Sequence, residues 1–431
     1  MAKVGDRVKV ESKDGVHEGI VLPSPENQKN VLMLKLNSGY NIGIKLDKSV
    51  KIKIIGAGTK LEKFPVARLK ENKNLPNISL IATGGTIGSR VDYKTGAVHM
   101  LLKPEELLAN VPELSNIVNL KKISRPFAIA SEDMSYVEWQ KIATEVAREL
   151  NAGAEGVIVT HGTDTLHYTA AALSFMLRNL SKPVALVGGQ RSSDRGSFDG
   201  ALNLICAANY CKSEIAEVSL IMHGEDADTY CLAIRGTKAR KFHASRRDAF
   251  RPVNDLPFAK IWIGKFEPIN TNYKRRTRDE KPVTADVRFE PKVALVKYFP
   301  GADPDIINYY ISKKYKGLVI EATGLGHVAT QPINKKNSWL PAIKKAIAKG
   351  IIVCFAPQTL YGRLNQFVYS NARMMHDAGV LYLGDMLPET ALVKLGWVLA
   401  HAKKPVEAKQ LMLANLVGEL NPRIPEEAFL Y

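Results

Sequence analysis

Cysteine and long apolar runs are scarce in this sequence of 431 residues. The chain has four widely spaced cysteines, and none forms the Cys-x-x-Cys pair that structural zinc sites favour. Its longest apolar stretches, such as Gly350 to Pro357, are far shorter than the roughly 18–20 residues that span a bilayer. A disulfide scaffold and an integral membrane protein are thereby excluded. We interpret the cysteines as small buried hydrophobic residues.

A secretory signal is also missing, because the first ten residues are charged throughout and contain no apolar stretch before a small-residue cleavage site. We therefore expect a cytoplasmic protein that makes no membrane contact. Apolar residues make up 45% and charged residues 24% of the chain, which is typical of globular proteins and excludes wholesale disorder. At a rough 150 residues per domain, the length predicts two or three domains.

Acidic residues are outnumbered, since 60 Lys and Arg stand against 43 Asp and Glu, for a net charge of +17. Residues 1–75 carry a disproportionate share of this excess, with 15 basic and 8 acidic residues. Such a balance favours contact with polyanions through phosphate neutralisation. A basic surface adapted to the cytosol, as in a thermophile, explains the same charge. Composition leaves both interpretations open.

The first 60 residues contain five short alternating apolar runs separated by turn residues, at 4–10, 17–22, 31–36, 40–46 and 50–55. This pattern predicts a small SH3-like β-barrel over residues 1–60. The polar stretch 61–77 has little periodicity and is predicted to be a linker. Aromatic residues are sparse before residue 78, so base stacking is disfavoured and we expect this barrel to serve as a docking module.

From residue 78 onward, continuous apolar runs alternate with amphipathic segments. This alternation is typical of an α/β fold with a mainly parallel sheet covered on both faces. We predict one α/β domain over 78–265, a charged linker over 266–291 and a smaller α/β domain over 292–431.

Polar residues follow several of the apolar runs, at the strand ends where open α/β sheets bind ligands. The segments are Ala82 to Gly88 with Thr86, Ser131 to Met134 with Glu132, Thr160 to Thr165 with Thr163 and Asp164, and Arg240 to His243 with Lys241. A threonine hydroxyl attacks a carbonyl only when a base removes its proton and donors stabilise the oxyanion. These four segments are the places where such a centre could lie.

Each residue also has a purely structural interpretation. Thr86 could be an N-cap or a turn residue after a strand, and Thr163 or Asp164 could cap the helix that begins near Thr165. Lys241, taken alone, could be an ordinary solvated lysine. The glycine loop at 84–88 matches neither G-x-G-x-x-G nor G-x-x-x-x-G-K-[ST], so nucleotide binding is disfavoured.

Four motifs together resemble the L-asparaginase/glutaminase family. They are ATGGTIG at 82–88, ASEDM at 130–134, THGTDTL at 160–166 and KFHASRRDAF at 241–250. The resemblance implies an asparaginase-like two-domain α/β fold over residues 78–431. It also implies hydrolysis of a carboxamide through an acyl-enzyme on a threonine.

The resemblance assigns roles to individual residues of this chain. Thr86 would be the nucleophile, and Thr163, Asp164 and Lys241 would form the second catalytic group. Ser131 and Asp164 would hold the amino-acid head group, Glu132 stands where many asparaginases have Gln, and Tyr93 is the candidate lid tyrosine. Lys238 is a rival to Lys241, which is preferred because its spacing to Asp248-Ala249-Phe250 matches the family.

Three features are similar to the D subunits of archaeal glutamyl-tRNA(Gln) amidotransferases, a branch of that family. They are the basic extension before residue 78, SRRDAF at 245–250 and DMLPETALVKLGW at 385–397. This implies a glutaminase that supplies ammonia to an E subunit, which converts Glu-tRNA(Gln) to Gln-tRNA(Gln). It implies a homodimer, within a heterotetramer with the E subunit. No cofactor is expected on this chain, and ATP and Mg²⁺ are expected on the partner. Alternatives are a free-standing type I L-asparaginase with an accessory domain, and an RNA-binding module on an old fold.

Overall fold

The computed structural model describes residues 2–24, 30–38, 40–56, 72–91, 98–99, 110–277 and 281–431. Within these ranges no helix is long and apolar enough to cross a membrane. All four cysteines are buried free thiols, as predicted. Residue 93, the candidate lid tyrosine, and most of the predicted linker 61–77 lie outside the described residues.

The N-terminal region is an antiparallel five-stranded β domain in the order β4-β3-β2-β1-β5. Its alternating residues point in turn to a small core, formed by Val8, Val10, Val21 and Leu34 among others, and to solvent. The strands follow the five predicted runs: β1 (Arg7–Ser12), β2 (Gly15–Leu22), β3 (Val31–Leu36), β4 (Asn41–Lys45) and β5 (Lys51–Gly56).

The central domain is built on an eight-stranded sheet in the order β18-β17-β14-β13-β12-β10-β6-β9. Pairing is parallel from β9 through β13 and antiparallel from β13 to β18, so the predicted mainly parallel sheet is confirmed, with an antiparallel edge added. The strands are β6 (Asn77–Ala82), β9 (Asn119–Ser124), β10 (Gly156–Thr160), β12 (Val184–Val187), β13 (Val218–His223), β14 (Tyr230–Arg235), β17 (Ala259–Trp262) and β18 (Lys265–Pro268).

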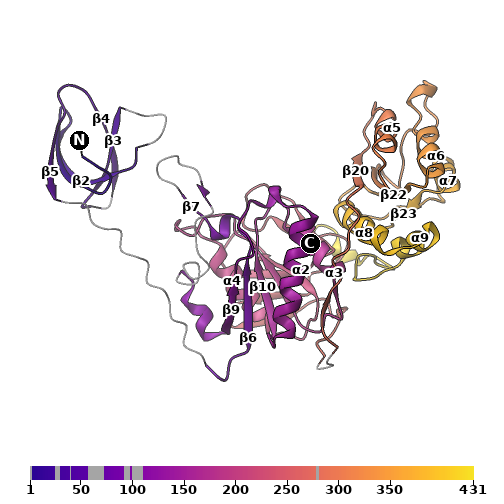
Figure 1. Cartoon of the computed structure of the whole chain (residues 1–431), viewed down its shortest axis with the longest axis horizontal. Coiled ribbons are helices and arrows are strands. Elements are labelled where there is room, and N and C mark those ends of the chain that lie inside the picture. The colour runs from indigo at the N-terminus through magenta and orange to yellow at the C-terminus, as the bar shows by residue number, and fades with distance from the viewer. Residues whose placement is uncertain are drawn as a thin grey trace.

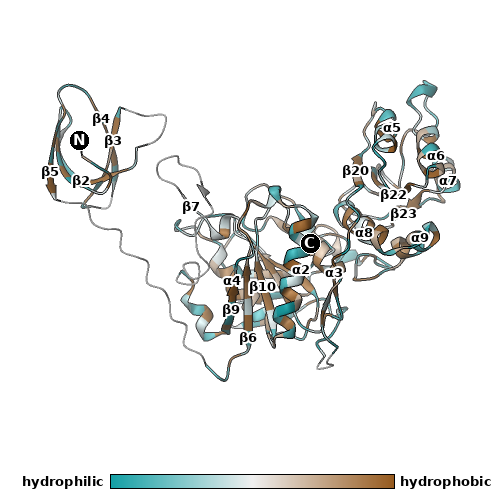
Figure 2. Ribbon diagram, in the orientation of Figure 1, coloured by the Kyte–Doolittle hydropathy of each residue, from teal (hydrophilic) through white to brown (hydrophobic). Residues whose placement is uncertain are grey.

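Helices cover both faces of this sheet (Figure 1). α2 (Tyr136–Asn151) and α3 (Leu166–Met176) pack on one face, and α4 (Gly200–Cys211) packs on the other. Central strands such as β10 are predominantly hydrophobic because both of their faces are buried, whereas α2 is hydrophilic on its outer side (Figure 2). α2 begins at a capping box in which Ser135 and Glu138 satisfy each other's backbone N–H groups.

The second α/β domain has a four-stranded parallel sheet in the order β20-β21-β22-β23. Its helix α8 packs against α3 of the first domain, and one hydrophobic core runs through both. The elements are β20 (Val293–Lys297), β21 (Gly317–Ala322), β22 (Ile352–Pro357), β23 (Leu381–Tyr382), α5 (Asp305–Ser312), α6 (Leu340–Ala348), α7 (Ser370–Asp377), α8 (Pro388–His401) and α9 (Pro405–Leu413).

Short elements connect these layers. Within the predicted linker 266–291, the structure places the end of β18 and the strand β19, which pairs with β11. The remaining elements are β7 (Arg90–Val91), β8 (Val98–His99), β11 (Leu177–Arg178), β15 (Ala239–Lys241), β16 (Phe250–Pro252), β19 (Thr284–Ala285) and the 3₁₀ turns Thr86–Gly88, Pro112–Asn116, Ser131–Asp133, Lys335–Asn337 and Glu426–Ala428.

Candidate active site

The two threonine-bearing loops leave the sheet from neighbouring parallel strands. β6 and β10 are paired with Ile81 opposite Val159 and Ala82 opposite Thr160, so their carboxyl ends lie at the same edge of the sheet. Thr83 extends this contact, because its backbone N–H donates to the Thr160 carbonyl at 3.1 Å. The loops that carry Thr86 and Thr163 therefore start side by side.

Glycines allow these loops to touch. A Cβ on Gly85, whose φ is +80°, would lie 2.4 Å from the Gly162 backbone. A Cβ on Gly162 would in turn lie 2.7 Å from the Ser131 hydroxyl oxygen. Only glycine permits approaches this close. The motifs that contain Thr86, Ser131 and Thr163 are therefore assembled into one cluster.

Lys241 binds both members of the Thr163–Asp164 pair. Its Nζ lies 2.9 Å from Thr163 Oγ1 and 2.6 Å from Asp164 Oδ1. The lysine side chain is 11% exposed and the Asp164 side chain 63%, so the amine is shielded while the carboxylate reaches the surface. The Thr163 hydroxyl is therefore hydrogen-bonded to the Lys241 amine, which in turn bonds the Asp164 carboxylate. Such a chain of groups can transfer a proton to or from a reacting group.

The capping interpretations of these residues are wrong. α3 has Thr165 at its N-cap, with no side-chain capping hydrogen bond, and Thr163 and Asp164 bond Lys241 instead. Gly85, not Thr86, occupies the capping position of the 3₁₀ turn Thr86–Gly88, so Thr86 is a turn residue after a strand, as its other structural interpretation predicted.

Lys238, the rival lysine, points elsewhere. Its Nζ forms a 2.7 Å ion pair with Asp385 of the second domain, and both side chains are fully buried. Burial lowers the pKa of the Lys238 amine, an effect that the Asp385 carboxylate opposes. Lys238 therefore ties the two domains together, and Lys241 is the lysine that meets Thr163.

Lys241 is presented by a hairpin, with Lys241 on β15 opposite Phe250 on β16. Asp248 braces the connecting loop, since its carboxylate accepts from Arg246 at 2.8 Å and from Arg251 at 2.6 Å. Burial tends to raise the pKa of Asp248, but these two guanidinium groups hold it below its usual value. The turn from Lys241 to Phe250 is thus braced by Asp248, which pairs with Arg246 inside the turn and with Arg251 directly after it.

Two buried histidines lie behind the site. His161 Nδ1 donates to the Gly162 carbonyl at 2.7 Å, so its Nε2 accepts from the Thr169 hydroxyl at 2.8 Å. Burial lowers the pKa of His161 to about 4. Burial, together with the positive charges of Arg240 and Lys241, lowers the pKa of His167 to about 3. Both rings are neutral at pH 7.

Gln190 was missed by the sequence predictions. It follows the predicted strand 184–189, and its Oε1 lies 3.5 Å from Thr163 Oγ1. Its backbone N–H is held by the Asp199 carboxylate at 2.9 Å. The Nε2 atom is buried and has no hydrogen-bond partner among the described residues. Its place directly after a parallel strand is the signal that could have identified it.

The two predicted residues Ser131 and Glu132 are neighbours in the sequence but differ in burial. Ser131 is buried, and its carbonyl accepts from the Thr165 hydroxyl at 2.7 Å, which ties the two loops together. Glu132 is exposed to solvent. Among the described residues, no group of three or more His, Cys, Asp or Glu side chains is arranged to hold a metal ion.

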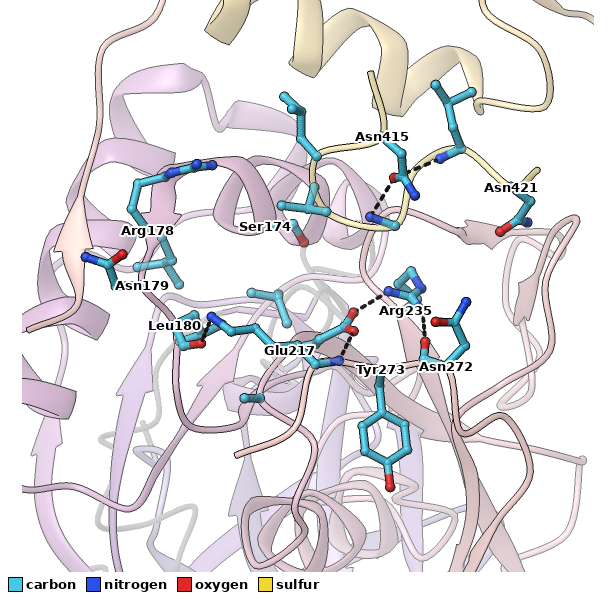
Figure 3. Close-up of a pocket in the computed structure, with 18 of the residues that line it drawn as sticks. Ser174, Arg178, Asn179, Leu180, Glu217, Arg235, Asn272, Tyr273, Asn415 and Asn421 are labelled. Carbon is cyan, nitrogen blue, oxygen red and sulfur yellow. Dashed lines mark hydrogen bonds and ion pairs between the residues drawn. The ribbon is translucent and has the colours of Figure 1, made fainter. Parts of the chain in front are cut away.

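A separate pocket of about 550 Å³ lies between the first domain and the segment 415–422 (Figure 3). Its polar groups bond one another: Arg235 donates to Glu217 at 2.6 Å, and the Lys274 backbone N–H donates to the same carboxylate at 2.8 Å. None of the predicted site residues lines it. This pocket is a junction between the domains, distinct from the Lys241 cluster.

Three family models match the chain in succession. They are the GatD N-terminal domain over residues 2–55, the N-terminal asparaginase domain over 77–275 and the glutaminase/asparaginase C-terminal domain over 292–412. Among solved structures, the L-asparaginase from Thermococcus kodakarensis has a TM-score of 0.70 at 26% identity. L-asparaginase I from Vibrio cholerae has a TM-score of 0.69 at 29% identity. Each comparison covers 80% of this chain and 99% of the other.

Two similar relatives extend over the whole length. The D subunit of the glutamyl-tRNA(Gln) amidotransferase of Pyrococcus furiosus is 51% identical, over 99% of this chain and 97% of its own. The protein of the same name from Thermococcus kodakarensis is 48% identical, over 99% of this chain and 96% of its own. The chain therefore belongs to the family of glutamyl-tRNA(Gln) amidotransferase D subunits, whose catalytic part is of the asparaginase type.

Proposed function

We propose that this chain is the glutaminase subunit of a tRNA-dependent amidotransferase, with Thr86 as its nucleophile. The observation that carries the proposal is the contact of one lysine, Lys241, with both the Thr163 hydroxyl and the Asp164 carboxylate. Thr163 and Asp164 lie at the same sheet edge as Thr86. The loop that carries them contacts the loop that carries Thr86.

In the proposed reaction, the Thr86 hydroxyl oxygen attacks the glutamine side-chain carbonyl carbon and loses its proton to a base. A tetrahedral oxyanion forms, and backbone N–H groups of the glycine turn stabilise it. The C–N bond then breaks, the nitrogen takes up a proton and leaves as ammonia, and a glutamyl ester remains on Thr86.

The second half of the reaction uses the cluster around Lys241. Thr163, with Lys241 and Asp164 behind it, relays a proton from water, which attacks the ester carbon. The ester C–O bond breaks, the Thr86 oxygen is protonated again and glutamate is released. Geometry supports this role, because the lysine is shielded from bulk water and within hydrogen-bond reach of the Thr163 hydroxyl.

The head group of glutamine needs partners for its ammonium and carboxylate. Asp164 is the proposed partner of the ammonium, since its carboxylate is largely exposed beside the cluster. Ser131 is proposed to contact the substrate from the loop packed against Gly162. Glu132 and Tyr93 are proposed as further contacts on the strength of the sequence motif alone.

The ammonia is proposed to pass to a partner E subunit, which would convert Glu-tRNA(Gln) to Gln-tRNA(Gln) with ATP and Mg²⁺. Full-length similarity to amidotransferase D subunits supports this assignment. The extra β domain supports it as well, because a GatD N-terminal model matches residues 2–55. A homodimer of this chain, within a heterotetramer with the E subunit, is the assembly we propose.

A free-standing L-asparaginase is the second candidate, and the resemblance of residues 77–412 to asparaginases favours it. Ammonia release from glutamine and from asparagine decides between the two functions. It should be measured with and without the E subunit and Glu-tRNA(Gln), for the natural chain and for Thr86→Ala.

The proposal predicts weak glutaminase activity of the chain alone, strong stimulation by the partner with its tRNA, and loss of both in Thr86→Ala. Rapid hydrolysis of free asparagine that the partner does not alter would overturn the amidotransferase assignment. Unchanged activity of Thr86→Ala would overturn the assignment of the nucleophile.

A further inference from the structure

The strand that carries Lys241 is fastened to the second domain at three points. Lys238 Nζ lies 2.7 Å from Asp385 Oδ2, and Arg240 Nη2 lies 3.3 Å from Glu389 Oε1. The Thr390 hydroxyl donates to the Thr237 carbonyl at 3.0 Å. We call residues 385–390, which lead into α8, the α8 clamp. It holds residues 237–240, directly before Lys241.

These contacts matter for β15 because it is short and is not a strand of the eight-stranded sheet. It is three residues long, and its ladder partner among the described strands is β16, in a two-stranded sheet. Its ladder does not continue into the eight-stranded sheet, which anchors the short segment before it, where the Gly236 N–H donates to the Val218 carbonyl of β13 at 2.9 Å. Side-chain contacts on either side of β15 add to this anchor in fixing its position.

Adjacent residues on a strand point to opposite faces, so Arg240 and Lys241 contact partners on opposite sides of β15. Lys241 reaches Thr163 and Asp164 on one side of β15. Arg240 reaches Glu389, the second residue of α8, on the other side. A shift of the α8 clamp would consequently move the backbone from which the Lys241 side chain extends.

The clamp is rigid at its centre. Lys238 and Asp385 are fully buried, and a buried ion pair resists separation because each charge alone would be strongly destabilised. Asp385 is itself fixed, since its second oxygen accepts from the Asn421 backbone N–H at 3.1 Å. α8 starts at a fixed point because Pro388 stands at its first position.

Glu389 has a further feature. Its Oε1 faces Arg240, while its Oε2 is buried and has no hydrogen-bond partner among the described residues. Leaving a carboxylate oxygen buried and unsatisfied is costly for stability. Its position beside β15 indicates that stability alone does not account for Glu389.

We propose that Arg240 and Glu389 are positioning residues for the reaction, through which the second domain sets the location of Lys241. This inference rests on the proposed function, because it assumes that Lys241 and Thr163 act on the substrate.

The test uses the full chain and measures kcat and KM for glutamine hydrolysis together with the thermal unfolding midpoint. Glu389→Gln and Arg240→Met should each lower kcat roughly 10- to 100-fold, the penalty for a misplaced catalytic group, while KM changes less than about threefold. The double variant Arg240→Met/Glu389→Gln should be no slower than the slower single variant, because both substitutions break the same contact. Arg240→Lys should recover part of the loss.

Glu155→Gln is the matched control, because it removes the carboxylate of an ion pair with Arg276, 3.0 Å long, that does not touch β15. This control should keep its kcat. If the Arg240 and Glu389 variants lower only the unfolding midpoint and retain kcat, the positioning role is refuted. Loss of activity in Thr86→Ala would still support the proposed function, so the two failures are distinguishable.

Discussion

Gly85 and Gly162 meet backbone to backbone, each directly before a threonine. A Cβ on Gly85 would lie 2.4 Å from both the Cα and the N atom of Gly162. Thr86 and Thr163, which are 77 positions apart in the sequence, therefore extend from two loops in direct contact. This contact is the basis on which we propose that both hydroxyls belong to one active site.

Gly85→Ala should separate the two loops. The new Cβ would collide with backbone that cannot rotate away, at a φ of +80° that alanine rarely adopts. We expect the free energy of unfolding to fall by about 3 kcal/mol and glutaminase activity to fall at least about 100-fold. Gly88→Ala is the control in the same loop, because a Cβ there meets nothing within 4 Å. Equal effects of both variants would contradict the contact.

Lys241→Met should mainly lower activity, whereas Lys238→Met should mainly lower the stability of the fold. Lys241→Met removes the amine beside Thr163, so kcat should fall by about 10³-fold with little change in the unfolding midpoint. Lys238→Met leaves the buried Asp385 carboxylate unpaired and should destabilise the fold by about 3–5 kcal/mol. Steady-state kinetics and chemical denaturation of both variants provide the comparison.

The double variant Lys238→Met/Asp385→Leu should regain most of the stability that Lys238→Met loses. Both buried charges are removed in it, so no unpaired charge remains in the interior. Denaturant midpoints of the single and double variants measure this recovery. Further destabilisation in the double variant would show that Lys238 and Asp385 act independently.

Stability should decrease as the pH falls from about 6.5 to 4 because of His161. The folded-state pKa of this buried ring is lowered from 6.5 to about 4. Between these values the unfolded chain binds a proton that the folded chain does not, so acid favours unfolding. The contribution is roughly 3 kcal/mol over the whole interval. Urea unfolding at pH 7 and pH 4.5 should show a smaller pH effect in His161→Gln than in the natural chain.

The sequence predicted those parts of the fold that follow from strong periodicity. β6, β10, β12 and β13 are buried, predominantly apolar runs that alternate with the helices α2, α3 and α4, so the parallel sheet could be recognised. The antiparallel edge was not predicted. β17 and β18 are only four residues long and contain polar and charged positions that resemble a connection.

The candidate site was predictable where a motif lies at a strand end, as for Thr86 and Thr163. Choosing Lys241 over Lys238 required the family resemblance, because two lysines three residues apart look alike in the sequence. The structure separates them through partners far along the chain, Asp164 for one and Asp385 for the other. The position of Gln190 beside Thr163 depends on how two strand-end loops meet, which no local pattern specifies.

The most direct test of the proposed function is Gln-tRNA(Gln) formation by the chain assembled with the proposed E subunit, using either glutamine or ammonium as the nitrogen donor. If Thr86 generates the ammonia, Thr86→Ala should abolish glutamine-supported formation and leave ammonium-supported formation unchanged. Glutamine-supported formation that persists at the natural rate in Thr86→Ala would contradict the account.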